Sequence, residues 1–201
     1  MKLSYSPTSP YVRKVTVLAI ETGLEGKYEK VTTSVAPTNF NAEHAKTNPL
    51  VKVPAMLLDN GEALYDSRVI CEYLDSLHSG PKMFPAQGPA RWTALRRQAL
   101  ADGILDAAIL TRYEGTRPAQ FQWPDWKEAQ LAKVKTALAA LEAEADTLGS
   151  TVDIGTITIG CALGYLDFRY ADMNWPKSHP KLAKWFAGFN ARPSMKATLP
   201  S

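Results

Sequence analysis

NPLVKVPAMLLDNGEALYDSRVICEYLDSL, residues 48–77, places two short apolar runs, a turn signal and a helix start in close succession. The apolar runs are residues 55–58 and 63–65, and Asp59-Asn60-Gly61 separates them. Asn-Gly between two apolar runs is a strong hairpin signal, because both residues tolerate the positive φ of a type I′ turn. The stretch therefore predicts a β-hairpin with a type I′ turn at Asn60-Gly61.

A helix is predicted directly after this hairpin. Asp66 and Ser67 are residue types that start helices, and Gly80-Pro81 is typical of a helix end. The apolar residues between them have helical spacing and are expected to form one buried face: Val69, Ile70, Tyr73, Leu74 and Leu77. A carboxylate, a hydroxyl and free N–H groups at a helix start also suit a bound carboxylate, although an ordinary N-cap would explain the same pair.

Pro54 opens the first strand of the hairpin and keeps Val53 out of ordinary helical geometry. If the Val53–Pro54 bond is cis, the main-chain N–H and C=O of Val53 turn outward, where an extended ligand can pair with them. An edge-strand proline with a trans bond is the alternative, because most X–Pro bonds are trans.

The chain before residue 48 predicts a strand, a helix and a second strand. Residues 2–5 and 28–33 are the strand candidates, and the helix between them begins with Ser9 as N-cap and Pro10 in its first turn. Such a unit is normally parallel with a right-handed crossover. Together with a short helix at 41–47, the order is β-α-β, helix, β-β-α, which is the thioredoxin-like arrangement.

The segment after the predicted hairpin and helix is rich in proline and glycine, and every strong periodic pattern beyond it is helical. We therefore expect a thioredoxin-like domain at 1–78, a linker at 79–89 and an all-helical domain at 90–201. In the second half, Asp153 is a good N-cap, and a helix that begins near Pro180 is expected to end at Arg192-Pro193.

Composition excludes several classes of protein. The chain has 201 residues, 45% apolar and 21% charged, with a net charge of +3. No Lys/Arg cluster suits a nucleic-acid backbone, and no apolar stretch approaches the roughly 18 residues of a membrane span. The N-terminus lacks an apolar signal core, so a cytoplasmic location is expected. Cys71 and Cys161 are expected to be small buried hydrophobes, and the three histidines share no ligand-like spacing, so no metal site is expected.

A thioredoxin-like half followed by an all-helical half resembles the cytosolic glutathione transferase superfamily, in particular its bacterial serine-type members. The motifs that carry the resemblance are Asn48-Pro49, Lys52-Val53-Pro54, Asp66-Ser67 with Ile70 and Tyr73-Leu74, residues 157–166, residues 179–182 with Trp185, and residues 191–194. The family usually has Ser or Thr, then Asp three residues later, at the start of its core helix. Here Asp153 and Thr156 exchange these groups, and we expect the local fold to survive because Asp caps as well as Ser.

The resemblance implies glutathione as co-substrate and a site for it in the first domain. The main chain of Val53, set by a cis Pro54, would pair with the cysteinyl unit. Asp66 would hold the γ-glutamyl ammonium, and Ser67 with the helix N-terminus would hold its carboxylate. Lys52 is a candidate partner for a carboxylate, or else a solvated loop lysine.

The resemblance also implies a partner for the glutathione thiol at the start of the first helix. Ser9 aligns with the serine of serine-type transferases, Thr8 is the alternative, and Ser9 could act as an N-cap only. No cysteine occurs at positions 8–12. This favours glutathione itself as the nucleophile, in conjugation or in glutathione-assisted reduction, over exchange through an enzyme thiol.

A second substrate would lie between the domains, beside Tyr11, Ile109, Arg112 and Tyr113. Aromatic and arginine side chains suit an apolar, electrophilic or anionic molecule, although the same residues could simply pack the domains together. The resemblance further implies a homodimer that acts in detoxification. The alternatives are a non-catalytic protein–protein interaction module of the same fold, or a glutathione-dependent reductase.

Overall fold

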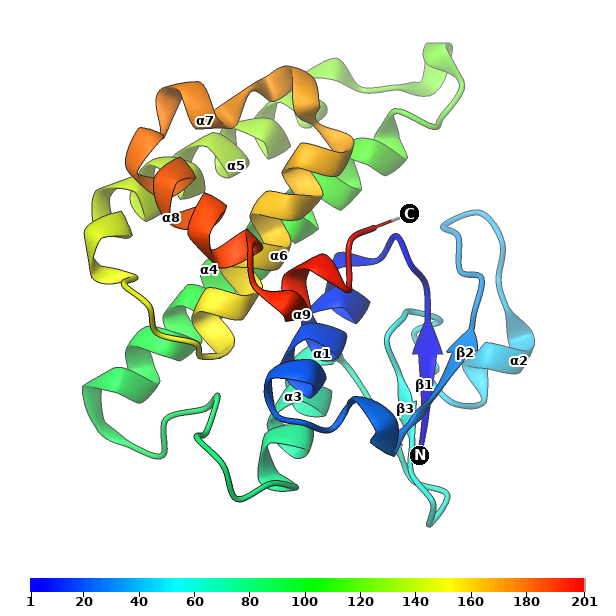
Figure 1. The fold of residues 1–201 in the computed structure, drawn as a ribbon. Coiled ribbons are helices and arrows are strands. Elements are labelled where there is room, and N and C mark those ends of the chain that lie inside the picture. The colour runs from blue at the N-terminus through cyan, green and yellow to red at the C-terminus, as the bar shows by residue number, and fades with distance from the viewer. Residues whose placement is uncertain (201) are drawn as a thin grey trace. The chain divides into compact units, whose positions relative to one another are not determined.

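A computed structural model describes residues 1–200 of the chain. They form two compact units, one of Met1–Gly88 with the segment that begins at Pro193, and one of Pro89–Arg192 (Figure 1). The units differ from the domain limits expected from the sequence in two places. Residues 79–88 and the segment after Arg192 belong to the first unit.

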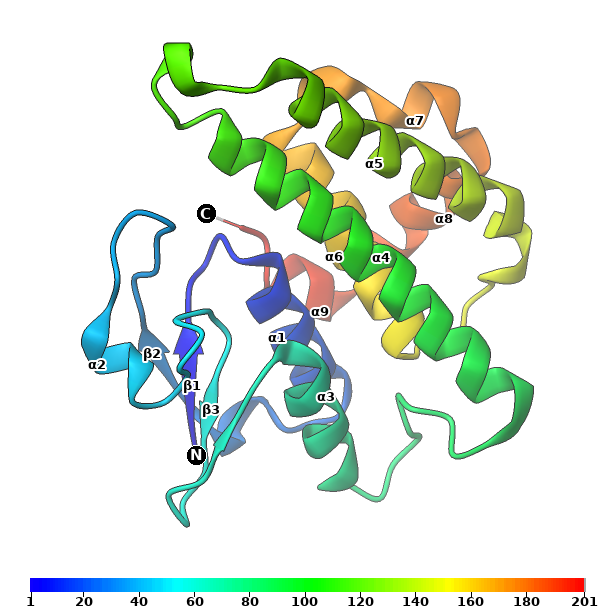
Figure 2. The ribbon, with the colours of Figure 1, turned by 180° about the vertical axis from the view of Figure 1, so that it is seen from behind.

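The first unit contains a four-stranded sheet with strand order β2-β1-β3-β4. β1 is parallel to β2 and antiparallel to β3, and β3 is antiparallel to β4. In Figures 1 and 2, α1 and α3 lie on one side of the sheet and α2 lies on the other. The strands are β1 (Lys2–Tyr5), β2 (Glu29–Thr32), β3 (Met56–Leu57) and β4 (Ala63–Leu64), and the helices are α1 (Pro10–Glu21), α2 (Ala42–Ala45) and α3 (Ser67–Ser76). This confirms the thioredoxin-like expectation.

The turn of the β3–β4 hairpin is not of type I′. Gly61 has φ 88°, but Asn60 is not among the residues with positive φ. Leu58 N donates to Glu62 O at 2.8 Å and Gly61 N donates to Leu58 O at 3.1 Å, so three residues connect Leu58 with its partner Glu62. A three-residue connection combines an ordinary turn with one left-handed glycine, which explains why a single residue needs positive φ.

The predicted apolar face of α3 is only partly correct. Ile70 and Leu74 are fully buried and pack in the first unit, but Val69 is 46% exposed and Leu77 is 44% exposed. Cys71 is buried in their place. The buried face is therefore rotated toward Cys71, because α3 packs against α1.

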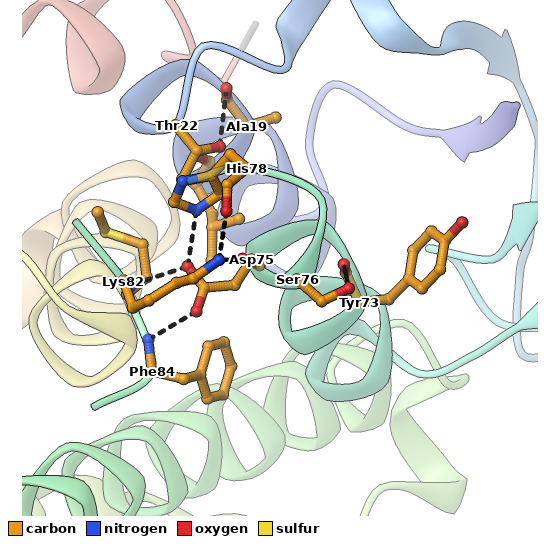
Figure 3. Close-up of polar contacts among 10 residues, drawn as sticks. Ala19, Thr22, Tyr73, Asp75, Ser76, His78, Lys82 and Phe84 are labelled. Carbon is orange, nitrogen blue, oxygen red and sulfur yellow. Dashed lines mark hydrogen bonds and ion pairs between the residues drawn. The ribbon is translucent and has the colours of Figure 1, made fainter. Parts of the chain in front are cut away.

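Asp75, near the end of α3, fastens the segment that follows the helix (Figure 3). Its buried carboxylate accepts hydrogen bonds from Met83 N at 2.8 Å, Phe84 N at 3.1 Å and the His78 ring at 3.0 Å. Lys82 Nζ donates to the Asp75 and His78 carbonyls. Much of the expected linker is therefore held against α3.

The last helix, α9 (Pro193–Lys196), belongs to the first unit and packs on α1. Arg13 Nη2 donates to Met195 O at 3.0 Å, and Ser194 Oγ donates to the Glu21 carboxylate. The return of the chain end to the first unit was not expected from the sequence.

The second unit is entirely helical, as expected. Its helices are α4 (Gly88–Glu114), α5 (Pro124–Glu144), α6 (Ile154–Arg169), α7 (Trp175–Ser178) and α8 (Pro180–Asn190). Figure 2 shows α4 and α5 side by side, and Arg96 on α4 pairs with Glu144 on α5 at 2.6 Å. Short 3₁₀ turns occur in the chain at Glu25–Lys27, Ala119–Phe121, Ala145–Thr147 and Ala171–Met173.

α6 is the buried core helix of the second unit. Asp153 Oδ1 accepts from Thr156 N at 2.8 Å, and Asp153 N donates to Thr156 Oγ1 at 2.9 Å, so the exchanged capping pair is confirmed. At Gly155 an added Cβ would lie 2.7 Å from Ala94 O. Only glycine therefore allows α6 to lie this close to α4.

Cys71 and Cys161 are both buried thiols, as the sequence predicted. Across residues 1–200, no helix combines the length and the apolar character that crossing a membrane requires.

Candidate functional site

Asn48 organises the loop that precedes β3. Its side chain is 1% exposed, accepts from Leu50 N through Oδ1 at 3.0 Å and donates through Nδ2 to Lys52 O at 2.8 Å. The Asn48 carbonyl accepts from Val51 N at 2.8 Å. Val51 has φ 52°, a left-handed conformation that is costly for a β-branched residue and persists only where the surroundings impose it. Asn48 supplies three of those constraints.

His44 holds the same loop from the other side. It is 6% exposed, and its Nε2 lies 2.9 Å from Lys52 O. Because a carbonyl oxygen only accepts, Nε2 must carry the ring proton in this contact. Asn41 Oδ1 accepts from His44 N at 2.9 Å and so fixes the helix start that carries the ring. Two buried donors therefore converge on the carbonyl just before Val53.

The main chain of Val53 is free to bind a ligand. The Val53–Pro54 bond is cis, as the resemblance implied, and the Tyr65–Asp66 bond is also cis. Within residues 1–200, neither the N–H nor the C=O of Val53 makes a hydrogen bond. Main-chain groups that are buried in folded proteins are almost always paired. A half-buried residue with both groups available is a place where an extended peptide can add as a strand.

The hairpin register brings Asp66 and Ser67 to the same end of the sheet as Val53. Met56 of β3 pairs with Leu64 of β4 in antiparallel register, so the segment that enters β3 and the segment that leaves β4 lie at the same end of the sheet. Asp66 is exposed and uses Oδ1 to accept from Arg68 N at 2.9 Å, which leaves its second oxygen for another donor. Ser67 is 2% exposed, and its hydroxyl has no partner within residues 1–200.

Ser9 and Thr8 lie on the loop that leaves β1 at this same end. Ser4 N donates to Ala55 O at 2.8 Å, so the chain after Tyr5 runs on beside Pro54. Ser9 caps α1 by accepting from Val12 N at 3.3 Å, which leaves the hydroxyl proton available to an acceptor. Thr8 Oγ1 lies 3.4 Å from Ser6 Oγ. Both hydroxyls are half-buried, and the N-cap role of Ser9 does not exclude a ligand role.

Lys52 is exposed, and its ammonium pairs with no carboxylate among residues 1–200. Three segments with predicted site residues therefore lie at the same end of the sheet, namely Thr8-Ser9, Lys52-Val53-Pro54 and Asp66-Ser67. His44 and Asn48 were not identified as site residues from the sequence. Their Asn-x-x-His and Asn-Pro patterns carried the only available signal.

The candidates for a second substrate fall on both units. Tyr11 is half-buried on α1, with the Lys14 ammonium 5.8 Å from its ring centroid. Ile109 and Tyr113 are half-buried on α4, and Arg112 is exposed there. The structure places these residues within their own units, and a joint role for them stays a prediction.

Tyr165, Arg169 and Tyr170 lie near Arg112 and Tyr113 within the second unit. Tyr170 OH donates to Ala108 O, one turn before Arg112, at 2.6 Å. Burial raises the pKa of Tyr165 to about 12, although the charges of Arg112 and Arg169 oppose this. These three residues were not singled out as site candidates from the sequence.

Comparison with known proteins finds a family match in each half of the chain. Residues 8–77 match the glutathione S-transferase N-terminal domain, and residues 124–188 match the glutathione S-transferase C-terminal domain. The chain is 35% identical over 203 residues to the uncharacterized GST-like protein YibF of Escherichia coli K12, with 100% of this chain and 98% of YibF covered.

Solved structures of glutathione transferase family members are also similar to the chain. A glutathione transferase family member from Pseudomonas fluorescens Pf-5 with bound glutathione is 48% identical, with a TM-score of 0.98 and coverage of 100% of this chain and 98% of that one. A structure of the same protein with bound S-(propanoic acid)-glutathione has a TM-score of 0.92 at 47% identity, with both chains covered over 100%. A more distant relative is elongation factor 1-gamma-B of Xenopus laevis, 23% identical over 81% of this chain and 37% of that protein.

Proposed function

Because the chain belongs to the glutathione transferase superfamily, we propose that it binds glutathione and promotes the attack of its thiolate on a small soft electrophile. The proposal includes a homodimer that acts in the cytoplasm in detoxification, which the family resemblance implies. The residues that carry the proposal are those at the edge of the sheet in the first unit.

The observation that carries the proposal is the free main-chain pair of Val53. Glutathione is a short extended peptide, so its cysteinyl N–H and C=O can pair with these two groups as an added strand. The Lys52 carbonyl, held by Asn48 and His44, fixes the direction in which the Val53 peptide points.

The two ends of glutathione have matching groups at the same edge. The free carboxylate oxygen of Asp66 suits the γ-glutamyl ammonium. The unpartnered hydroxyl of Ser67 and the first N–H groups of α3 suit the γ-glutamyl carboxylate. The unpaired ammonium of Lys52 suits the glycyl carboxylate.

Ser9 is the leading partner for the thiol, with Thr8 as the alternative. Lowering a thiol pKa from about 8.5 to about 6.5 requires roughly 2.7 kcal/mol in favour of the thiolate. A hydrogen bond to a charged group supplies about 1.5–3 kcal/mol, and a helix N-terminus supplies about 0.3–1 kcal/mol. A hydroxyl at the start of α1 therefore supplies enough without a general base. The reaction then forms a carbon–sulfur bond, and the leaving group departs with its electron pair or the electrophile takes up a proton.

The relatives support conjugation. The P. fluorescens protein binds both glutathione and S-(propanoic acid)-glutathione, a thioether of glutathione. The absence of cysteine at positions 8–12 disfavours the rival reaction, a reduction through an enzyme thiol.

Calorimetry with Ser67→Ala tests the proposal. We expect the wild-type protein to bind glutathione, and a concentration about a hundred times Kd to stabilise it by about 2.7 kcal/mol. Ser67→Ala should weaken binding about tenfold, because it removes a hydrogen bond to a carboxylate. Ser76→Ala, an exposed serine at the other end of α3, is the matched control and should bind as wild type. A protein that glutathione neither binds nor stabilises would contradict the proposal.

The second candidate function is a non-catalytic interaction module, and the likeness to elongation factor 1-gamma-B favours it. A module of that kind needs no pocket for glutathione. The calorimetric experiment therefore separates the two, because a scaffold would give no heat of binding and no thermal shift with glutathione.

A further inference from the structure

Arg13 joins α1 to the segment that contains α9. The two helices pack against each other within the first unit, and Figures 1 and 2 show them side by side. Arg13 Nη2 donates to Met195 O at 3.0 Å, and Arg13 Nε donates to Thr198 Oγ1 at 3.4 Å. The Thr198 hydroxyl donates in turn to Ser194 O at 2.8 Å, so its oxygen faces Arg13 as an acceptor. The guanidinium is therefore held at two points of this segment.

The Arg13 guanidinium is buried without an acidic partner. Arg13 is 6% exposed, and it makes no ion pair with a carboxylate among residues 1–200. Arginine is almost never buried in this way unless it is paired, because its charge loses the solvation that water gives it. A hydrogen bond from a charged donor is stronger and more directional than apolar packing. It therefore fixes α1 closely against the segment that contains α9.

Arg13 also closes the first turn of α1 on Ser9. Arg13 N donates to Ser9 O at 3.0 Å, while Ser9 Oγ accepts from Val12 N at the longer distance of 3.3 Å. Ser9 precedes Arg13 by four residues, which is about 6 Å along the helix axis. A cap bond of this length is weak and does not fix the Ser9 hydroxyl by itself. The position of the hydroxyl therefore depends on the turn that Arg13 closes.

Glu21 attaches the other end of α1 to the same segment. Ser194 is 1% exposed, and its hydroxyl donates to the Glu21 carboxylate. Glu21 follows Arg13 by eight residues, which is about 12 Å along the helix axis. Attachments this far apart limit both the sliding and the tilting of α1. Loss of the Arg13 attachment would leave α1 held at its far end, with its start free to move.

We propose that Arg13 is a positioning residue: its bonds to Met195 and Thr198 hold the start of α1 where the Ser9 hydroxyl can reach the glutathione sulfur. The groups that suit the rest of glutathione lie on the loop before β3 and at the start of α3, so a small shift of α1 leaves them in place. A hydrogen bond weakens steeply with distance and angle, and a displacement of about 1 Å can slow a reaction about 10²-fold. This role rests on the proposed function, in which Ser9 contacts the sulfur.

The pKa of the thiol of bound glutathione, measured by the ultraviolet absorbance of its thiolate, tests this role in the full chain. Arg13→Gln should raise that pKa by about 0.5–1 relative to wild type, which is an about three- to tenfold change in the ionisation constant. S-methylglutathione has no thiol, and calorimetry should give it the same Kd in both proteins within about twofold. The sulfur contact is therefore measured apart from the rest of the binding.

Three further variants separate the contacts of Arg13 from other effects. Arg13→Lys keeps the charge and loses the fork, so it should restore part of the wild-type thiol pKa. Thr198→Val has nearly the same shape and removes the acceptor of Arg13 Nε, so it should raise the thiol pKa by a smaller amount, and it serves as the test if Arg13→Gln does not fold. Lys82→Gln is the matched control, because Lys82 Nζ also donates to two main-chain carbonyls, those of Asp75 and His78, but at the end of α3. It should leave the thiol pKa unchanged.

Combination with Ser9→Ala shows whether Arg13 acts through Ser9. In Ser9→Ala the sulfur has already lost this hydroxyl, so the addition of Arg13→Gln should raise the thiol pKa no further. A further rise of similar size would overturn the proposal, since the Arg13 charge would then act on the sulfur directly.

Two other results would also overturn the role of Arg13. An unchanged thiol pKa in both Arg13→Gln and Thr198→Val would show that the sulfur contact does not depend on these bonds, and the proposed function would still stand. Binding of S-methylglutathione that weakens in Arg13→Gln as much as the thiol pKa changes would show that Arg13 supports the whole site and not the Ser9 contact. A wild-type chain that does not bind glutathione would overturn the proposed function as well.

Discussion

Replacement of Asn48 by alanine should weaken glutathione binding without touching any group that contacts the ligand. The Asn48 side chain donates to Lys52 O and accepts from Leu50 N, and both bonds would be lost. Leu50 is 64% exposed, so water can replace the second bond, whereas the Lys52 carbonyl would keep only His44 as a buried donor. Val51, at φ 52°, would lose part of what imposes its conformation.

The magnitude follows from these contacts. A net hydrogen bond contributes about 0.5–1.5 kcal/mol, and an imposed left-handed residue stores about 1–3 kcal/mol that the loop releases when it relaxes. In Asn48→Ala, we therefore expect the free energy that favours the binding conformation of residues 48–54 to fall by about 2 kcal/mol. If glutathione must restore that conformation, its Kd should rise about thirtyfold.

Isothermal titration calorimetry with glutathione measures this effect, and Asn60→Ala is the matched control. Asn60 also makes two side-chain hydrogen bonds, to Glu62 N at 3.0 Å and Glu62 Oε2 at 2.8 Å, but it lies at the exposed hairpin tip. Its replacement should change Kd by less than twofold. An Asn48→Ala protein that binds glutathione as tightly as Asn60→Ala would refute the claim that the loop is held for binding.

Three other variants test separate parts of the structure. Ser9→Ala should move the pH–rate profile upward by about 1–2 pH units, because the thiolate loses about 1.5–3 kcal/mol of hydrogen bonding, and a shift in Thr8→Ala in its place would assign the role to Thr8. Asp75→Asn should lower the free energy of unfolding by about 2–4 kcal/mol, since an amide cannot accept from all three donors, while the exposed Asp59→Asn should cost less than about 1 kcal/mol. Tyr28→Phe should raise stability by about 1 kcal/mol, because the buried Tyr28 hydroxyl has no partner within residues 1–200.

Tyr28 also makes the stability of the folded chain depend on pH, and the direction of that dependence follows from its pKa. Burial raises the pKa of Tyr28 far above its ordinary value. The folded state then binds this proton more tightly than the unfolded state does, so stability is complete below about pH 10 and falls as the pH rises beyond it. In Tyr28→Phe, chemical denaturation between about pH 9 and 11 should show a shallower loss of stability than in wild type. An unchanged slope would contradict the burial of this hydroxyl.

Short sequence patterns predicted the parts of the fold that depend on interactions between residues close together in the chain. Ser9-Pro10 starts α1, Gly23 with φ 72° follows its end, and Asp153 and Thr156 form the capping box of α6. Each of these depends on groups a few residues apart. Such groups are read directly from the sequence.

Features that depend on distant segments were not predictable in this way. Asp75 accepts from Met83 and Phe84 in what the composition indicated was a free linker, and Arg13 binds the carbonyl of Met195 far along the chain. The type I′ turn was wrong for a related reason. The strand register sets the number of connecting residues, and the Asn-Gly pair alone does not.

The sequence predicted the residues that would contact a ligand at the candidate site. It did not predict the residues that hold the loop before β3 in place. The resemblance supplied Ser9, Val53, Asp66 and Ser67, and the β1–β3 and β3–β4 registers bring their segments to one edge of the sheet. His44 and Asn48 could not be assigned to the site from their sequence patterns alone, because their role depends on a carbonyl that both reach only in the folded loop.

A crystal structure of the chain with glutathione tests the central claim most directly. The account predicts that the cysteinyl N–H and C=O pair with the main chain of Val53, that the γ-glutamyl group lies against Asp66 and Ser67, and that the sulfur lies within hydrogen-bond distance of Ser9 or Thr8. Glutathione bound elsewhere, or with its sulfur turned away from the start of α1, would contradict it.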